Sequence, residues 1–198
     1  MHIHEYILRY HPEYHTIETY PADRVAPIRR AADEWGILGN MHRSPIVVDG
    51  VTFPTGEHLF QIMKFSDTGI RQALLSDTNP MTMKRFKVKK YERLGMARPD
   101  WGEFLVDSLK FCLTRKYEQD DSFRAELERS RGLSILEDET NRQKGKAADS
   151  YGAVLSADGR SYVGPNLLGR LLMELRDKDG HLDYSLPAAY TGFADLLP

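Results

Sequence analysis

The apolar and polar positions of residues 45–65 predict a short strand, a turn, a second short strand and the start of a helix. Residues 46–48 and 51–53 are short apolar runs, and Asp49-Gly50 between them suits the positive φ angles of a two-residue hairpin turn. Thr55 is a good N-cap for the helix that follows. Its core-facing positions at helical spacing are Leu59, Ile62 and Met63. The segment therefore predicts a β-hairpin that runs directly into a helix.

The remaining elements are predicted in the same way. Residues 2–10 mix aromatic and β-branched types, which favours a strand. Residues 11–26 contain two prolines and no clear period, which indicates an arm or loop. Further predicted elements are a strand at 25–29, helices that begin at Asn79-Pro80 and at Asp100-Trp101, a helix at 122–131, a strand at 133–136, a loop at 141–148 and a helix capped by Asn166.

Composition restricts the classes of protein that are compatible with this pattern. The chain has 198 residues, of which 41% are hydrophobic and 28% charged, as is usual for a globular domain with a core. The net charge of -2 gives no overall attraction to nucleic acid or membrane. Cys112 is the only cysteine, so an intrachain disulfide is impossible. With no signal peptide and no membrane-spanning run in the sequence, we expect a cytoplasmic protein that does not bind membranes.

Glu57 is the residue whose position most strongly suggests chemistry. It opens an otherwise apolar helix, where desolvation would disfavour its charged form and so favour a general acid. Gln61 and Lys64 follow at i+4 and i+7, so one helical stripe would carry an acid, an amide and an ammonium. Taken alone, however, a glutamate in the first turn more often serves the helix dipole.

A second candidate feature is a basic run, which consists of Lys84, Arg85, Lys87, Lys89, Lys90 and Arg93. Such a run is most often a solvated helix face. Six cations so close together in a net-acidic protein also make a local site for phosphate or nucleic acid plausible. The histidines show no convincing metal-ligand spacing, so we expect neither a metal nor another cofactor.

The order of several sequence blocks resembles the NADAR family, named for NAD and ADP-ribose. The resemblance extends from about Ile28 to Arg176. The blocks are Trp35-Gly-Ile-Leu-Gly-Asn-Met41, Pro45 to Gly50, Thr55-Gly-Glu-His-Leu-Phe-Gln61 with Lys64-Phe65, Asn79-Pro80-Met81, Arg98-Pro-Asp-Trp101, Asp149-Ser-Tyr-Gly152 and Gly164 to Arg176. No single block is decisive, but their order and spacing together are specific.

The resemblance implies an α+β fold, mostly helical, with a small sheet or hairpin. We expect an N-terminal arm at 1–27, the catalytic domain at 28–177 and a C-terminal tail at 178–198. It also implies an N-glycosidase: some members hydrolyse phosphorylated riboflavin-pathway intermediates, and others remove ADP-ribose from guanine in nucleic acid, as antitoxins against ADP-ribosylating toxins. The second substrate is slightly preferred here, which makes a toxin a possible partner.

Residue by residue, the resemblance implies that Glu57 and Asp149 are catalytic. It implies that substrate is bound by Asn40, Gln61, Lys64, Trp101 and Tyr151. Three positions depart from the family pattern, since Gly39 and Gly56 stand where serine is usual and Tyr151 stands where tryptophan is usual. The polar segment 142–148 resembles an insertion, so Glu137 or Asp138 remain stand-ins for Asp149.

These residue types suit cleavage of a ribose N-glycosidic bond, which passes through an oxocarbenium-like state. By analogy with O-glycosidases, Glu57 would act as acid and base while Asp149 positions water or ribose. Aromatic faces at Trp101 and Tyr151 would hold the base, and Lys64 or a member of the basic run would pair with phosphate. Taken alone, Trp101 favours the core and Asp149 a loop cap. A non-catalytic ADP-ribose or nucleic-acid binding module remains an alternative.

Overall fold

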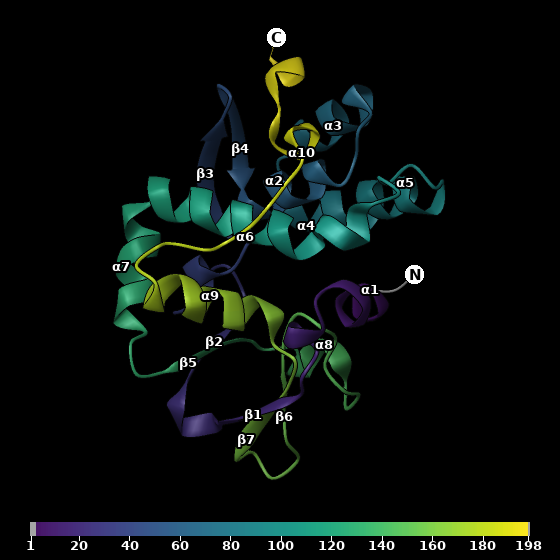
Figure 1. Cartoon of the computed structure of the whole chain (residues 1–198). Helices are drawn as coiled ribbons and strands as arrows, with labels where there is room; N and C mark the ends of the chain where they lie inside the picture. The colour runs from purple at the N-terminus through teal and green to yellow at the C-terminus, as the bar shows by residue number, and fades with distance from the viewer. Residues whose placement is uncertain (1–2, 198) are drawn as a thin grey trace. The chain divides into compact units, whose positions relative to one another are not determined.

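The computed structural model describes residues 3–197 and has an α+β fold, mostly helical with small sheets, as the sequence predicts (Figure 1). Contacts divide the chain into two units. The first unit comprises the described residues up to Gly39 together with Asp121–Leu182, and the second comprises Asn40–Asp120 together with the described residues from Asp183 onward. The predicted division into arm, catalytic domain and tail follows different boundaries and stays a prediction.

The first unit packs one long helix against two small sheets. Strands β1, β7 and β6 form an antiparallel sheet in that order, and β2 pairs with β5 in parallel. The buried leucines of α9 occupy one helical face and contact β5, as the amphipathic pattern predicts. The elements are α1 (Ile3–Tyr10), η1 (Pro12–Tyr14), β1 (Glu18–Pro21), η2 (Ala22–Arg24), β2 (Val25–Ile28), η3 (Gly36–Leu38), α7 (Asp121–Arg129), β5 (Ser134–Glu137), α8 (Thr140–Gln143), β6 (Val154–Leu155), β7 (Ser161–Gly164) and α9 (Leu167–Asp177).

The second unit combines a hairpin with a group of helices. Strands β3 and β4 pair only with each other, and α2 packs against α6 and α3 (Figure 1). The elements are β3 (Arg43–Val48), β4 (Val51–Thr55), α2 (Gly56–Met63), α3 (Thr68–Leu75), α4 (Pro80–Thr82), the π-helical segment η4 (Met83–Val88), α5 (Lys89–Arg93), α6 (Trp101–Gln119), α10 (Ala188–Thr191) and η5 (Ala194–Leu196).

The hairpin and α2 form where the sequence places them. Asp49 and Gly50 have φ angles of 50° and 79°, which are the positive values that the turn requires. The Thr55 hydroxyl accepts the backbone N–H of His58 at 3.2 Å and caps α2. Asn79 likewise caps α4 by accepting the N–H groups of Met81 and Thr82. These local signals fix the entry into α2, so they also fix where Glu57 lies.

Three predicted elements are wrong. Residues 3–10 form helix α1 rather than a strand, because Ile3 and Ile7 recur at helical spacing and Ile7 is buried; His2 lies outside the described residues. Residues 11–26 are not a plain loop, because they contain η1, β1 and η2, and β1 gains its order from pairing with the distant β7. The loop expected at 141–148 begins inside helix α8.

The C-terminal segment from Asp183 packs within the second unit. Phe193 packs edge-to-face against Phe53, with ring centroids 4.9 Å apart. Arg71 donates to the backbone oxygen of Gly192 at 2.7 Å and pairs with Asp195 at 3.1 Å. These contacts hold the segment against β4 and α3. Across residues 3–197, none of the helices combines the length and apolar character that crossing a bilayer requires.

Candidate active site

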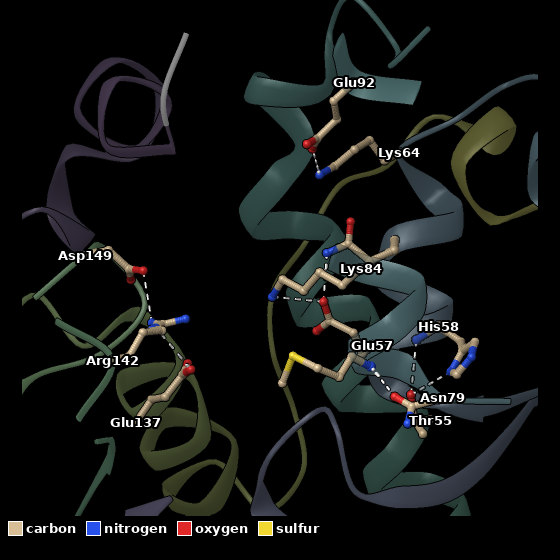
Figure 2. A network of polar contacts seen from close by, with 12 residues as sticks. Thr55, Glu57, His58, Lys64, Asn79, Lys84, Glu92, Glu137, Arg142 and Asp149 are labelled. Atoms are coloured by element: carbon tan, nitrogen blue, oxygen red, sulfur yellow. Dashed lines mark hydrogen bonds and ion pairs between the residues drawn. The ribbon is translucent and has the colours of Figure 1, made fainter. Parts of the chain in front are cut away.

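Glu57 is buried in the second unit, in the first turn of α2. Its residue exposure is 4%, and its backbone N–H donates to the backbone oxygen of Asn40 at 2.9 Å. Gln61 Nε2 donates to the carboxylate oxygen Oε1 at 2.8 Å, which places the two side chains together as the i, i+4 spacing predicts. Lys84 Nζ lies 3.0 Å from the same oxygen (Figure 2).

The surroundings of the Glu57 carboxylate are therefore more polar than the apolar helix pattern suggests. An ammonium at 3.0 Å stabilises negative charge on the carboxylate by Coulomb attraction, which a buried site screens less than water does. Lys84 is about one third exposed, whereas the Glu57 side chain is buried. Glu57 and Lys84 thus form an ion pair at the boundary between the interior and solvent.

Sequence reasoning found Lys84 in the basic run but did not pair it with Glu57. The lysine lies in η4, where the chain winds as a π-helix from Met83 to Val88. π-helical turns are rare and occur frequently at functional sites. Lys84 and Glu57 lie on different elements, so spacing along the sequence alone does not bring them together.

Lys64 pairs with an acidic side chain instead of presenting a free ammonium. Its Nζ donates to Glu92 Oε1 at 2.6 Å and lies 5.2 Å from the centre of the Trp101 ring. Burial lowers the pKa of Lys64, and the Glu92 carboxylate opposes that shift. A phosphate at this position would have to compete with Glu92, which is the more exposed partner.

Trp101 lies in the packed interior of the second unit, with an exposure of 5%. Tyr190 stacks against it at 6.3 Å between ring centroids, and Phe60 lies at 5.2 Å. The Tyr190 hydroxyl donates to Asp100 at 2.8 Å, which ties the stacked ring to the start of α6. In this arrangement the indole packs against Phe60 of α2 and lies beside Lys64, and its role in binding a base stays a prediction.

Asp149 and Tyr151 belong to the first unit, in the segment before α9. Asp149 Oδ1 accepts the backbone N–H of Tyr151 at 2.8 Å, so Asp149 does form a local cap. Its Oδ2 accepts from Arg142 Nη2 at 3.0 Å, and Arg142 also lies 3.8 Å from Glu137 (Figure 2). The backbone oxygens of Ser150, Tyr151 and Gly152 accept the N–H groups of Leu167, Leu168 and Asn166, respectively, which satisfies the start of α9.

Glu139 is a residue of this network that sequence reasoning missed. Its side chain is fully buried and also binds Arg142 and Gln143. Its Oε2 accepts the backbone N–H of Asp149 at 2.8 Å. Burial raises the pKa of Glu139 to about 8, and the contact with Asp149 adds to the rise. Its sequence context, between Asp138 and Thr140, gives no signal of burial.

The candidate residues thus fall into two groups of polar side chains, one in each unit. The second unit joins Asn40, Glu57, Gln61 and Lys84, with Lys64 at the C-cap of α2 and Glu92 on α5. The first unit joins Asp149 to Arg142 and Glu139. Within residues 3–197, no group of three or more His, Cys, Asp or Glu side chains has a geometry that could hold a metal ion. The carboxylate–ammonium pair at Glu57 is suited to proton transfer.

Comparison with known proteins gives a consistent result. The model of the NADAR domain matches residues 28–178. N-glycosidase YbiA of Escherichia coli (strain K12) is 31% identical over 156 residues, which cover 79% of this chain and 89% of that protein. N-glycosidase YbiA of Shigella boydii has the same identity and coverage.

Two further similarities extend the comparison. The riboflavin biosynthesis protein VVA0006 of Vibrio vulnificus is 26% identical over 152 residues, and the match spans 38% of that longer protein. The NMR structure of Escherichia coli YbiA is similar with a TM-score of 0.61 and 30% identity, covering 79% of this chain and 84% of that one. Domain match, sequence relatives and fold thus agree: the chain belongs to the NADAR family and is a hydrolase that acts on N-glycosidic bonds.

Proposed function

We propose that the chain hydrolyses the bond between a phosphorylated ribose and a base, with Glu57 as the acid and base. The observation that carries this proposal is the buried carboxylate of Glu57 held between the amide of Gln61 and the ammonium of Lys84. A carboxylate fixed by two donors is oriented for proton transfer before substrate binds. Asp149 and Tyr151 keep, as predictions, the roles that the family resemblance implies.

The proposed reaction uses only side-chain chemistry and water. Water attacks C1 of the ribose and gives its proton to Glu57, while the electrons of the C1–N bond pass to the base. Glu57 then returns the proton to the base nitrogen, so the carboxylate is restored. Lys84 Nζ, 3.0 Å from Glu57 Oε1, orients the carboxylate that accepts this proton. We expect this metal-independent reaction to take place in the cytoplasm.

ADP-ribosylated guanine in nucleic acid is the first candidate substrate. Lys84 belongs to a segment, η4 with α5, that exposes Arg85, Phe86, Lys89 and Lys90 to solvent. Cations beside an exposed aromatic ring are typical of surfaces that bind nucleic-acid backbone and bases. Removal of ADP-ribose from guanine would oppose an ADP-ribosylating toxin, so an antitoxin role belongs to this proposal.

A phosphorylated intermediate of riboflavin biosynthesis is the second candidate substrate. One relative carries the name of a riboflavin biosynthesis protein, which favours this alternative. Both candidates contain a phosphorylated ribose joined to a nitrogen of a base, so both are compatible with the same chemistry at Glu57.

A mass-spectrometric screen of released products tests the proposed function. Purified protein is incubated with ADP-ribosylated DNA, ADP-ribosylated RNA and phosphorylated riboflavin precursors, and the free base and sugar phosphate are quantified. We expect release from at least one substrate, with ADP-ribosylated nucleic acid the fastest. If none of the substrates releases a base while the protein is folded, the proposed substrate class is wrong.

Neutralising the exposed cations of η4 and α5 should separate the two substrates. We expect the triple substitution of Arg85, Lys89 and Lys90 by alanine to lower kcat/KM on ADP-ribosylated DNA by about tenfold or more, because each lost cation removes a phosphate contact. Hydrolysis of a mononucleotide substrate should change little. Initial rates on both substrates, measured at two salt concentrations, check this prediction.

Lys87 provides the matched control for the triple variant. Its Nζ donates to the Ala73 backbone oxygen at 2.8 Å and lies 3.2 Å from Asp77, so it holds η4 to the end of α3. Lys87→Ala should therefore affect folding stability more than substrate preference. An equal loss on DNA and on the mononucleotide in the triple variant would contradict a nucleic-acid surface.

A further inference from the structure

Gln61 and Asn40 are hydrogen-bonded to Glu57, and the side-chain amide oxygen of each lacks a donor among the residues that the structure describes. Gln61 Nε2 donates to Glu57, so Gln61 Oε1 is left over, and it is buried in a residue that is 3% exposed. Asn40 Oδ1 is buried as well, and the backbone oxygen of Asn40 accepts the N–H of Glu57. Each residue is thus hydrogen-bonded directly to Glu57, and its side-chain amide oxygen remains available as an acceptor.

Gly56 preserves the space beside one of these acceptors. A Cβ atom at position 56 would lie 3.0 Å from Asn40 Oδ1, closer than ordinary van der Waals contact. Glycine therefore leaves that oxygen uncrowded at the residue immediately before Glu57. The backbone of Gly56 does not itself require glycine, since its φ angle is not positive.

Buried acceptors without a donor are rare in folded proteins, because losing water without gaining a partner is unfavourable. Two of them around one buried carboxylate suit a ligand that supplies O–H or N–H groups. Glu57 is itself an acceptor, so all three side chains favour a donor-rich ligand over an acceptor-rich one such as phosphate.

We propose that Asn40 Oδ1 and Gln61 Oε1 accept hydrogen bonds from the ribose hydroxyls of the substrate. This inference rests on the proposed function, since a carboxylate that acts at C1 of ribose brings its own hydrogen-bonded neighbours close to the C2 hydroxyl. Hydrogen bonds to that hydroxyl strengthen as positive charge develops on the ring. Asn40 and Gln61 therefore determine specificity for ribose over 2-deoxyribose.

Binding of two small probes tests this inference without requiring hydrolysis. Ribose 5-phosphate and 2-deoxyribose 5-phosphate are titrated into the full chain, and the dissociation constants are measured by NMR. We expect the unmodified protein to favour ribose 5-phosphate by roughly tenfold, the effect of about one hydrogen bond. Asn40→Ala, Gln61→Leu and Gly56→Ala should each reduce this preference, the last by crowding Asn40 Oδ1.

The ratio of the two dissociation constants distinguishes recognition from structural support. A structural role would weaken both probes equally and leave the ratio unchanged. Gln72→Leu, which removes an exposed amide on α3, is the control and should keep the full preference. If Gln61→Leu fails to fold, Asn40→Ala and Gly56→Ala still decide the matter.

Equal binding of the two probes to the unmodified protein, or an unchanged ratio in the folded variants, would overturn the inference. Water alone would then satisfy the two oxygens. Hydrolysis is measured separately in the product screen. A failure of the ribose inference can therefore be distinguished from a failure of the proposed function. If the protein prefers ribose 5-phosphate but releases no base, the proposed function is contradicted. The inference that Asn40 and Gln61 contact ribose would still hold.

Discussion

Glu57→Gln should lower kcat by about 10³-fold while the protein stays folded, since positioned acid–base groups contribute roughly 10²–10⁴ to rates. The glutamine has nearly the same shape as glutamate and keeps an oxygen that can accept from Gln61 or Lys84. It cannot take up and return a proton, so the proposed route through the carboxylate is closed. Single-turnover hydrolysis of the substrate found in the product screen measures the effect.

Two controls make this result specific. Glu103→Gln changes an exposed acid in the first turn of α6 and should leave the rate unchanged. Binding of ribose 5-phosphate to Glu57→Gln should remain measurable, because the neighbouring amide oxygens are still present. Full hydrolysis by folded Glu57→Gln would refute the assignment of Glu57 as the acid and base.

The sequence was sufficient where local signals determine the structure. The hairpin at 46–53, its Asp49-Gly50 turn and the capped start of α2 follow from turn and capping chemistry within a few residues. The i, i+4 relation between Glu57 and Gln61 is likewise a property of one helix. The position of Glu57 relative to Gln61 was therefore predictable without any tertiary information.

The parts of the site that could not be predicted from the sequence depend on contacts between residues far apart in the chain. Lys84 lies in the π-helical segment η4 and pairs with Glu57 on α2, a contact between two elements that no short motif predicts. The burial of Trp101 depends on Tyr190, which is 89 residues further along the chain and outside the segment that resembles the family. Its packing agrees with the core position that tryptophan alone favours.

Asn166 shows how a correct position can have an unexpected role. It stands at the N-cap of α9, as predicted, but its φ angle of 53° is left-handed and its side chain makes no capping bond. Instead Nδ2 donates to the Ile135 oxygen at 2.9 Å, and Oδ1 accepts the N–H of Glu137 at 3.3 Å. The amide joins α9 to β5, and only the fold brings these elements together.

Gly152→Ala should destabilise the chain more than any surface substitution, by about 3 kcal/mol in the free energy of unfolding. A Cβ atom at position 152 would lie 2.2 Å from the Glu137 backbone oxygen and 2.8 Å from Glu139 Cγ. The first neighbour is backbone of β5 and the second is buried, so neither can move away cheaply. Denaturant unfolding followed by circular dichroism measures the loss.

Gly159→Ala is the matched control, because it separates steric overlap from backbone strain. Gly159 has a φ angle of 70°, and a Cβ atom there would meet nothing within 4 Å. That variant should lose only about 1 kcal/mol, the usual strain of a left-handed residue. Equal losses in the two variants would mean that the segment before α9 relaxes around a methyl group. The contact between Gly152 and β5 would then not be what holds Asp149 and Tyr151 in place.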